Sequence, residues 1–292
     1  MSASLTMIGQ RTQAAGWDFS VWTVLKWAVA ICLTVVAVFP IVWMVNVVFA
    51  EPGVPVSINP RLVPTSFSHG VEKIRMIFTE TPYLRAYYVS IAYSLLTIAG
   101  VLIVGSMAAF EFALFEFPGK RPMFAVVMLS LMVPSAVTLI PRYLLTADLG
   151  WLNTMQGLVV PGLASAFGLF MLIQFMKSIP KEMIEAARLD GASHFQIYLH
   201  VALPLSKNAL VTLAILTFMQ TWGNFIWPLI VAPSPQLYTV GQVVGLFNAP
   251  FSHVTVDVVM AANLLAALPP LIFFLLFQRK IVEGIAMSGT KG

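Results

Sequence analysis

The residues best suited to bind a small polar molecule gather between positions 220 and 227. Gln220 and Asn224 are four apart, so on one helix they would share a face. Their amides can hydrogen-bond hydroxyl groups, and the rings of Trp222 and Trp227 can stack on the face of a sugar ring. The same four residues would also suit helix packing with satisfied amides and tryptophans at a membrane interface. Both interpretations stay open.

Two further polar residues stand in apolar surroundings. Asn263 lies within a long apolar run, where a polar group is a functional candidate by default. Arg142 lies at the end of an earlier run, and we hypothesise that it contacts an acidic group on a solute. The alternative is a charge at the membrane rim, close to lipid headgroups.

Other kinds of chemistry find little support. The chain has no G-x-x-x-x-G-K-[ST] loop and no G-x-G-x-x-G after a strand, so it predicts no nucleotide site of its own. The histidines are scattered, and His194 and His200 are six apart, which is poor spacing for a metal on one helix face. No Ser/His/Asp arrangement suggests hydrolysis, and the single cysteine, Cys32, excludes a disulfide framework. We expect no catalytic residue, metal or cofactor in this chain.

The composition indicates the environment of these residues. Of 292 residues, 59% are hydrophobic and 10% are charged, whereas globular domains have about 45–50% apolar and about 25% charged residues. A soluble fold cannot bury that excess. The apolar runs are long and lack period-2 alternation, so we expect an all-α polytopic membrane protein with six spans. The net charge of +4 fits basic cytoplasmic loops better than a nucleic-acid surface.

The spans divide the chain into simple segments. We expect a cytoplasmic tail over residues 1–23, a first transmembrane helix over 24–49, an external loop over 50–86, a core of five further spans over 87–278 and a cytoplasmic tail over 279–292. The five later spans are predicted over 87–110, 123–141, 156–176, 205–231 and 256–277, with Pro134 interrupting the second of these, and residues 232–255, rich in proline, glycine and asparagine, are predicted to form a second external loop. Most of the 16 lysines and arginines then fall on the side of the two termini. This bias predicts that both termini are cytoplasmic.

One polar stretch, residues 178–208, separates two of the spans and faces the cytoplasm in this topology. Its charged residues are Lys181, Glu182, Glu185, Arg188, Asp190 and Lys207. Pro180 suits the first turn of a helix, and Gly191 can end that helix in the left-handed conformation. Ser193 and Gln196 have capping-box spacing for a second helix, which Pro204 closes at the membrane. The pattern predicts a helix–turn–helix outside the bilayer, which from its physics alone could simply pack on its own protein.

The same stretch carries a resemblance. Glu185-Ala186-Ala187, Asp190-Gly191-Ala192 and Leu203-Pro204 resemble the "EAA" signature of ABC-importer permease subunits. The segments Ser178-Ile-Pro-Lys-Glu, Trp222-Gly-Asn-Phe-Ile-Trp-Pro-Leu-Ile and Phe277-Gln-Arg-Lys are similar to the carbohydrate branch, above all to the smaller permease of maltose-type importers. The likeness covers nearly the whole chain after residue 85. The chain departs from the pattern at Arg142, where an apolar residue is usual, and the first 80 residues show little likeness.

The resemblance implies a fold, a function and a set of partners. It implies the fold of a type I ABC importer permease in the bacterial cytoplasmic membrane, translocating a sugar or oligosaccharide, acidic ones included. The implied partners are a second homologous permease, two ATPase subunits that dock on residues 178–204 and an external solute-binding protein, with ATP and Mg²⁺ on the ATPases. The implied coupling residues are Glu185, Ala186, Ala187, Asp190, Gly191, Ala192, Phe195 and Pro204. A polyol or glycerol-phosphodiester permease, an ion-coupled secondary transporter and a membrane scaffold or receptor remain as alternatives.

Overall fold

The computed structural model describes residues 21–51, 63–249 and 254–289, with side chains to residue 278. All regular structure in these residues is helical, as expected. The predicted tail over residues 1–23 lies almost entirely outside the described residues. The long helices are α1 (Val21–Val48), α2 (Phe67–Glu80), α3 (Tyr83–Leu114), α4 (Lys120–Met132), α5 (Ser135–Asp148), α7 (Ala166–Met176), α11 (Lys207–Trp222) and α14 (Val256–Gly289). The short ones are α6 (Met155–Val159), η1 (Val160–Gly162), α8 (Lys181–Leu189), α9 (His194–Ile197), η2 (Tyr198–Ala202), α10 (Leu203–Leu205), α12 (Ile226–Val231), η3 (Pro235–Leu237) and α13 (Val240–Phe247).

Three helices are long and apolar enough to cross a membrane unbroken, namely α1, α3 and the first part of α14, which ends at Gln278. Three bent helix pairs bring the number of candidate spans in the described residues to six, if each pair counts as one. α4 and α5 meet at 108°, the run from α6 to α7 bends by 46°, and the helix that ends at Leu205 meets α11 at 76°. The described residues therefore reach the expected six spans only when each bent pair is taken as one span.

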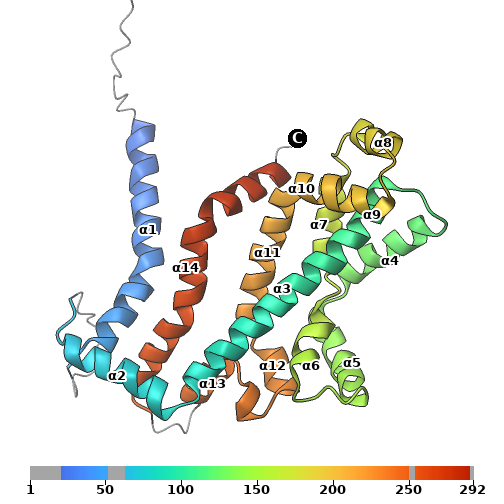
Figure 1. Cartoon of the computed structure of the whole chain (residues 1–292). Helices are drawn as coiled ribbons and strands as arrows, with labels where there is room; N and C mark the ends of the chain where they lie inside the picture. Colours follow the sequence, from blue (N-terminus) through green and yellow to red (C-terminus); the bar gives the residue numbers. More distant parts are fainter. Residues whose placement is uncertain (1–20, 52–62, 250–253, 290–292) are drawn as a thin grey trace, which may run out of the picture.

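The break between α4 and α5 has a local cause. Pro134 disfavours helical geometry in the residue before it, and Val133 takes an extended conformation with ψ of 118°. The predicted span over 123–141 is thus two helices at a wide angle rather than one interrupted rod. α5 packs on α12 at the end of the molecule opposite α8 (Figure 1).

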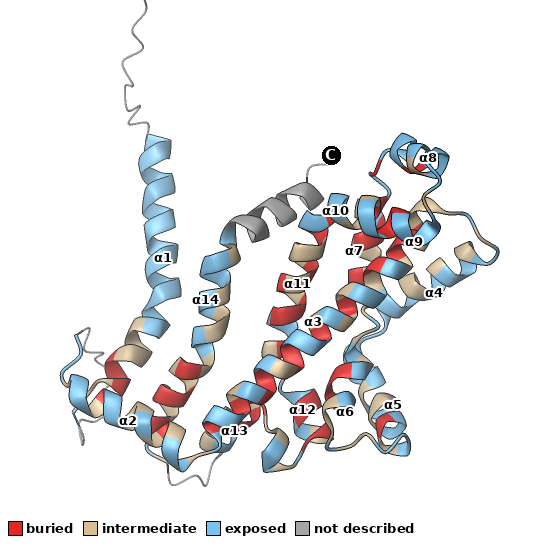
Figure 2. Ribbon diagram, viewed as in Figure 1, coloured by how far each residue is buried: buried red, intermediate tan, exposed pale blue. Residues whose placement is uncertain are grey.

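α3 is the central element of the fold. It crosses the molecule diagonally and packs along α7 and α11 (Figure 1). Gly100 permits the close approach of the α6–α7 segment, because a Cβ there would lie 2.4 Å from a methyl carbon of Leu163. The buried residues follow α3, α7 and α11, and a second group lies where the lower parts of α1 and α14 meet α2 and α13 (Figure 2).

Both segments expected to be external loops contain a helix. In residues 50–86, α2 buries Ile77 on one face, and in residues 232–255, α13 buries Val240 and Val243 behind a capping box at Thr239. Apolar residues at helical spacing explain both elements, although flanking prolines and glycines suggested loops. Lys73 of α2 holds this side of the molecule together: its ammonium group lies 2.8 Å from Asp257 of α14 and donates to the carbonyl groups of Val48 and Ala50.

The two ends of the described chain lie on one side of the molecule. The first turn of α1, the end of α14 and the polar helix α8 are all at the top of Figure 1. This arrangement agrees with an even number of membrane crossings. α14 also continues as helix beyond the predicted span end at residue 277, as far as Gly289.

Candidate functional site

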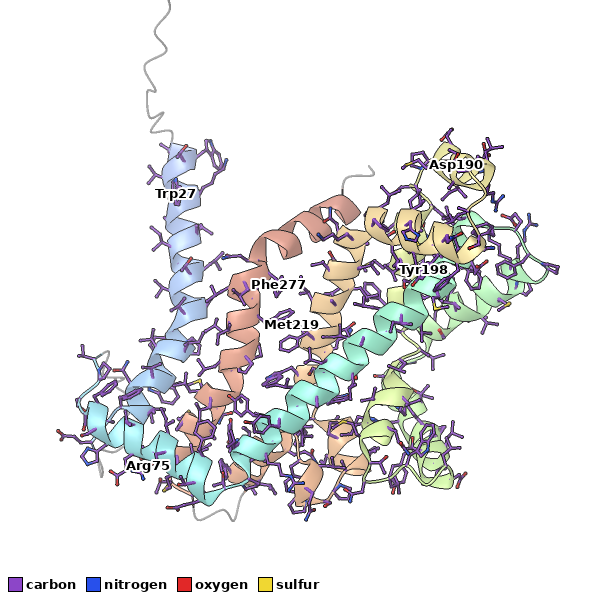
Figure 3. The ribbon with its side chains drawn as sticks, in the orientation of Figure 1. Trp27, Arg75, Asp190, Tyr198, Met219 and Phe277 are labelled. Carbon is purple, nitrogen blue, oxygen red and sulfur yellow. The ribbon has the colours of Figure 1, made fainter. Side chains whose placement is uncertain are left out.

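The polar stretch forms a compact hairpin, which we call the coupling segment (residues 178–206). α8 begins after Pro180 and ends at Leu189, as predicted. Glu182 lies in its first turn and Arg188 in its last, so both charges interact favourably with the helix dipole. The coupling segment projects from the body of the molecule, with Asp190 at its outer tip (Figure 3).

Backbone geometry shapes the turn. Gly191 has φ of 79°, the left-handed conformation expected for a helix-ending glycine. Ala192 N–H then donates to the carbonyl of Ala187 at 3.0 Å. The capping box follows: Ser193 N–H donates to the Gln196 side chain at 2.7 Å, and Gln196 N–H donates to the Ser193 hydroxyl at 3.3 Å. The predicted helix–turn–helix is confirmed down to its hydrogen bonds.

The second half of the segment differs from the prediction. A π-helical turn, η2, follows α9, and the helix continues through Pro204 instead of closing there. The sharp bend falls two residues later, at Ser206, which precedes α11. Pro204 is the second residue of α10, directly after the π-helical turn, where Leu203 N–H donates to the carbonyl of Tyr198.

Aromatic and charged side chains tether the coupling segment to the end of α3. His194 Nε2 lies 3.0 Å from a carboxylate oxygen of Glu111, and its ring lies over Phe115 with centroids 4.0 Å apart. Arg188 covers the same phenylalanine at 4.9 Å. Tyr198 is buried against α3, where its hydroxyl and that of Ser106 are 2.7 Å apart. These contacts join the coupling segment to the end of α3.

The residues implied in coupling divide by exposure. Glu185, Ala186, Asp190, Gly191, Phe195 and Pro204 are exposed, and Ala187 and Ala192 are half-buried. Of the apolar residues nearby, Leu189 is 89% exposed and Phe195 is 59% exposed, whereas Ile184 lies in the chain's own core. The outer face of α8 thus combines a carboxylate, a flat alanine surface and a free leucine. Such a face suits contact with another protein.

A second group of residues, the tryptophan cluster (Tyr93, Arg142, Asn224 and Trp227), lies where α3, α5 and α12 meet. Trp227 is 2% exposed, and its indole N–H is shared between the carbonyls of Gly157 and Leu158 at 3.3 Å. The guanidinium carbon of Arg142 lies 3.9 Å above the Trp227 ring. Arg142 is therefore stacked inside a helix junction rather than standing free at the rim of a span.

The expectation that Gln220 and Asn224 share a helix face is wrong. α11 ends at Trp222, and Gly223 caps it. Asn224 instead accepts from Trp227 N–H at the start of α12 and donates to the Tyr93 hydroxyl at 3.4 Å. The glycine at 223 was the signal that could have placed the end of the helix.

Two of the three remaining candidates have partners within the chain. Trp222 donates its indole N–H to the carbonyl of Ala266 at 3.0 Å and stacks on Phe218. Asn263 is half-buried in α14 and donates to the carbonyl of Val259 one turn back. Gln220 is exposed. The structure does not bring these three residues and the tryptophan cluster into one site.

Known proteins share both the sequence and the fold. Residues 101–286 match the family described as binding-protein-dependent transport system inner membrane component. The chain belongs to this family. It is 30% identical to the arabinooligosaccharides transport system permease protein AraQ of Bacillus subtilis (strain 168) over 72% of this chain and 74% of that protein. It is also 31% identical to the sn-glycerol-3-phosphate transport system permease protein UgpE of Rhizobium meliloti (strain 1021), over 86% of this chain and 91% of that protein.

A solved structure shares the architecture. A chain of a bacterial ABC transporter involved in the import of the acidic polysaccharide alginate superposes with a TM-score of 0.80, covering 89% of this chain and 96% of that chain, at 19% identity. The all-helical fold predicted from the sequence is thus that of an ABC importer permease. The chain is an inner-membrane component of such a transporter, and the matched family residues include the whole coupling segment.

Proposed function

We propose that this chain forms part of the path by which a sugar or oligosaccharide enters the cell, driven by separate ATPase subunits. The coupling segment carries the proposal. It is a shaped, exposed protein surface on the side of both chain ends, held to α3 by His194 and Tyr198. Relatives named for arabinooligosaccharides and for lactose support a carbohydrate solute.

The proposed complex has four further components in three roles. A second, homologous permease completes the path, two ATPase subunits bind ATP and Mg²⁺ and dock on residues 178–204, and an external binding protein delivers the solute. In this arrangement the two termini and the coupling segment are cytoplasmic. ATP closes the ATPase pair and moves α8, and the binding protein favours the outward-facing state, so each ligand drives the switch by preferring one conformation.

The test replaces Glu185 by lysine in the importer reconstituted into proteoliposomes with its partner subunits. Because a reversed charge at the centre of a protein interface disrupts docking, we expect solute-stimulated ATP hydrolysis and transport to fall about tenfold or more. Glu116→Lys is the matched control, since Glu116 is an equally charged, 90% exposed residue outside the segment. Wild-type transport and stimulated hydrolysis in Glu185→Lys would contradict docking at α8.

A second proposal concerns the kind of solute. Arg142 makes no salt bridge in the described part of the chain, and its Nε atom is buried without a hydrogen-bond partner. A guanidinium left with free donors is suited to a carboxylate or phosphate. Relatives named for sn-glycerol-3-phosphate and a fold neighbour that imports an acidic polysaccharide support the same interpretation. We therefore propose that Arg142 favours solutes with an acidic group.

Paired transport assays separate this proposal from a packing role. Arg142→Gln removes the charge, and we expect it to lower uptake of an acidic oligosaccharide while uptake of a neutral one of the same length is unchanged. Arg142→Lys keeps the charge and should retain part of the acidic uptake. Equal losses for the two solutes, or no loss for either, would show that Arg142 serves only to pack on Trp227.

A further inference from the structure

Two adjacent prolines lie in the middle of α14, inside its candidate span. Proline has no N–H, so Pro269 and Pro270 cannot donate to the residues four positions earlier in the helix. The carbonyl groups left without their helical partners are those of Leu265 and Ala266. In a bilayer no water is available to replace those hydrogen bonds, so an unpaired carbonyl is costly.

Side chains from two other helices supply the missing donors, one for each carbonyl. The Tyr87 hydroxyl, on α3, donates to the carbonyl of Leu265. The Trp222 indole N–H, on the last turn of α11, donates to the carbonyl of Ala266 at 3.0 Å. The two aromatic rings also pack edge to face, with centroids 6.0 Å apart. We call these two side chains and the two carbonyls the carbonyl clamp.

The match between donors and vacated carbonyls is specific. Tyr83, one turn before Tyr87, also donates to α14, but its acceptor is the carbonyl of Ala262, whose helical donor Ala266 keeps its N–H. Pro40 in α1 likewise vacates the carbonyl of Val36, and no side chain in the described part of the chain donates to it. The clamp therefore joins three helices at the two carbonyls where α14 has lost its own hydrogen bonds.

We propose that the carbonyl clamp is the joint through which α11 positions α14 during transport, with Tyr87 and Trp222 as positioning residues. α11 begins immediately after the coupling segment and ends at Trp222, so it is a rod of about 24 Å at the usual rise per residue. When the coupling segment is displaced, α11 transmits the movement to its far end. There the clamp contacts the turn of α14 that lacks two helical hydrogen bonds. This step rests on the proposed role of residues 178–204.

The clamp also gives Trp222 a role different from solute recognition. Its N–H is engaged with Ala266, and its ring packs between Tyr87 and Phe218. Because these contacts occupy both its N–H and its ring, Trp222 positions α14 and does not stack on a sugar. Trp222→Phe should accordingly lower the maximal transport rate and leave the half-saturating solute concentration unchanged.

Pairwise rescue tests the clamp. Trp222→Phe and Tyr87→Phe each remove one donor and keep the ring, and we expect each to lower transport by the reconstituted importer about threefold to tenfold, the range that interhelical hydrogen bonds in membranes support. Pro270→Ala restores an N–H for the Ala266 carbonyl, so it should rescue Trp222→Phe but not Tyr87→Phe. Pro269→Ala, which restores the donor for Leu265, should rescue Tyr87→Phe but not Trp222→Phe.

Thermal unfolding of the purified importer in detergent is measured for the same two single and four double variants, and it is independent of solute and of ATP. Tyr83→Phe is the control, and neither proline replacement should rescue it. The clamp would be overturned if one proline replacement rescued both donor variants, or if neither proline replacement rescued any. Paired rescue of stability without any change in transport rate would overturn its positioning role. If only the proposed docking site were wrong, the paired pattern would persist in both measurements while Glu185→Lys remained active.

Discussion

The coupling segment and the tryptophan cluster use polar residues in opposite ways. In the coupling segment the backbone shapes itself, through Gly191 and the capping box at Ser193, and Glu185 and Asp190 point outward. In the tryptophan cluster Arg142 stacks on the Trp227 ring, Asn224 accepts from the Trp227 backbone N–H, and the Trp227 indole donates to backbone carbonyls. The first region is built from neighbours in the sequence and presents a surface. The second brings together residues from separate parts of the chain, and most of their polar groups have partners within it.

The two regions should therefore respond differently to substitution. In the coupling segment a change of backbone geometry moves the whole surface, whereas a change of one exposed side chain affects only its own contacts. In the tryptophan cluster, contacts made by side chains hold the helices together, so truncating one of them leaves a cavity and unpaired carbonyl groups. The variants below test this division.

Gly191→Pro should have the largest effect. Proline fixes φ near −65° and cannot reach the 79° of this position, and it also removes the N–H that donates to the carbonyl of Arg188. We expect the importer to reach the membrane but to lose transport and solute-stimulated ATP hydrolysis by about a hundredfold, because the outer face of α8 is displaced. Parallel assays of membrane level and uptake check this expectation.

The matched control is Gly191→Asn. A Cβ at this position would meet no atom within 4 Å, so only the backbone conformation matters, and asparagine tolerates the left-handed region better than other residues. Uptake close to that of the wild type is expected for Gly191→Asn. Equal inactivity of the asparagine and proline variants would mean that the missing side chain itself, rather than the turn, is what the site requires.

Trp227→Ala comes next and should act on stability. The side chain is 2% exposed and supports Arg142, and removing a buried tryptophan costs about 3–5 kcal/mol. A fall in the thermal unfolding temperature of the importer measures this loss. Trp227→Phe keeps an apolar ring but not the N–H, so it should lose less stability. If Trp227→Ala abolished uptake with an unchanged unfolding temperature, the cluster would contact solute directly.

The sequence predicted the coupling segment better than the tryptophan cluster, because only the coupling segment is shaped by neighbouring residues. Proline, glycine and capping-box positions act on the residues beside them, so the bounds of α8 and the turn at Gly191 follow from local rules. The stacking of Arg142 on Trp227 joins residues 85 positions apart and depends on the 108° bend after Val133. Pro134 predicted an interruption there, but no local rule gives the angle of such a bend.

The two segments that were expected to be external loops show a second limit of the sequence. α2 and α13 have apolar residues at helical spacing, but the surrounding prolines and glycines indicated loops, and a short helix gains little stability until it packs. Their burial against α14, which the sequence does not reveal, stabilises them. The carbonyl clamp shows the same limit. Pro269 and Pro270 predict two unpaired carbonyls in the helix, but the sequence does not indicate which helices supply the donors.

Ser193→Ala should have a smaller effect, confined to the coupling segment. It removes the hydroxyl that accepts from Gln196 N–H, and loss of an N-cap costs about 1 kcal/mol. Hydrogen exchange of the amides at the start of α9 should speed up about fivefold while exchange in α3 is unchanged. Ser193→Thr retains the hydroxyl and serves as the control. Faster exchange throughout α3 would show that the segment is not an independent unit.

Glu116→Gln should have the smallest effect. Glu116 lies beside the coupling segment, and the hydrogen bond and charge of Lys120, 2.8 Å away, lower the pKa of its carboxyl. A lowered pKa means that the pair contributes above the unfolded pKa of glutamate and that this contribution is lost as the pH falls through the lowered value. At neutral pH the pair is therefore fully formed, yet it is exposed, and exposed pairs add little stability. The unfolding temperature and the uptake rate of Glu116→Gln should match those of the wild type near neutrality. A clear loss of uptake would extend the docking surface beyond residues 178–206 to the end of α3.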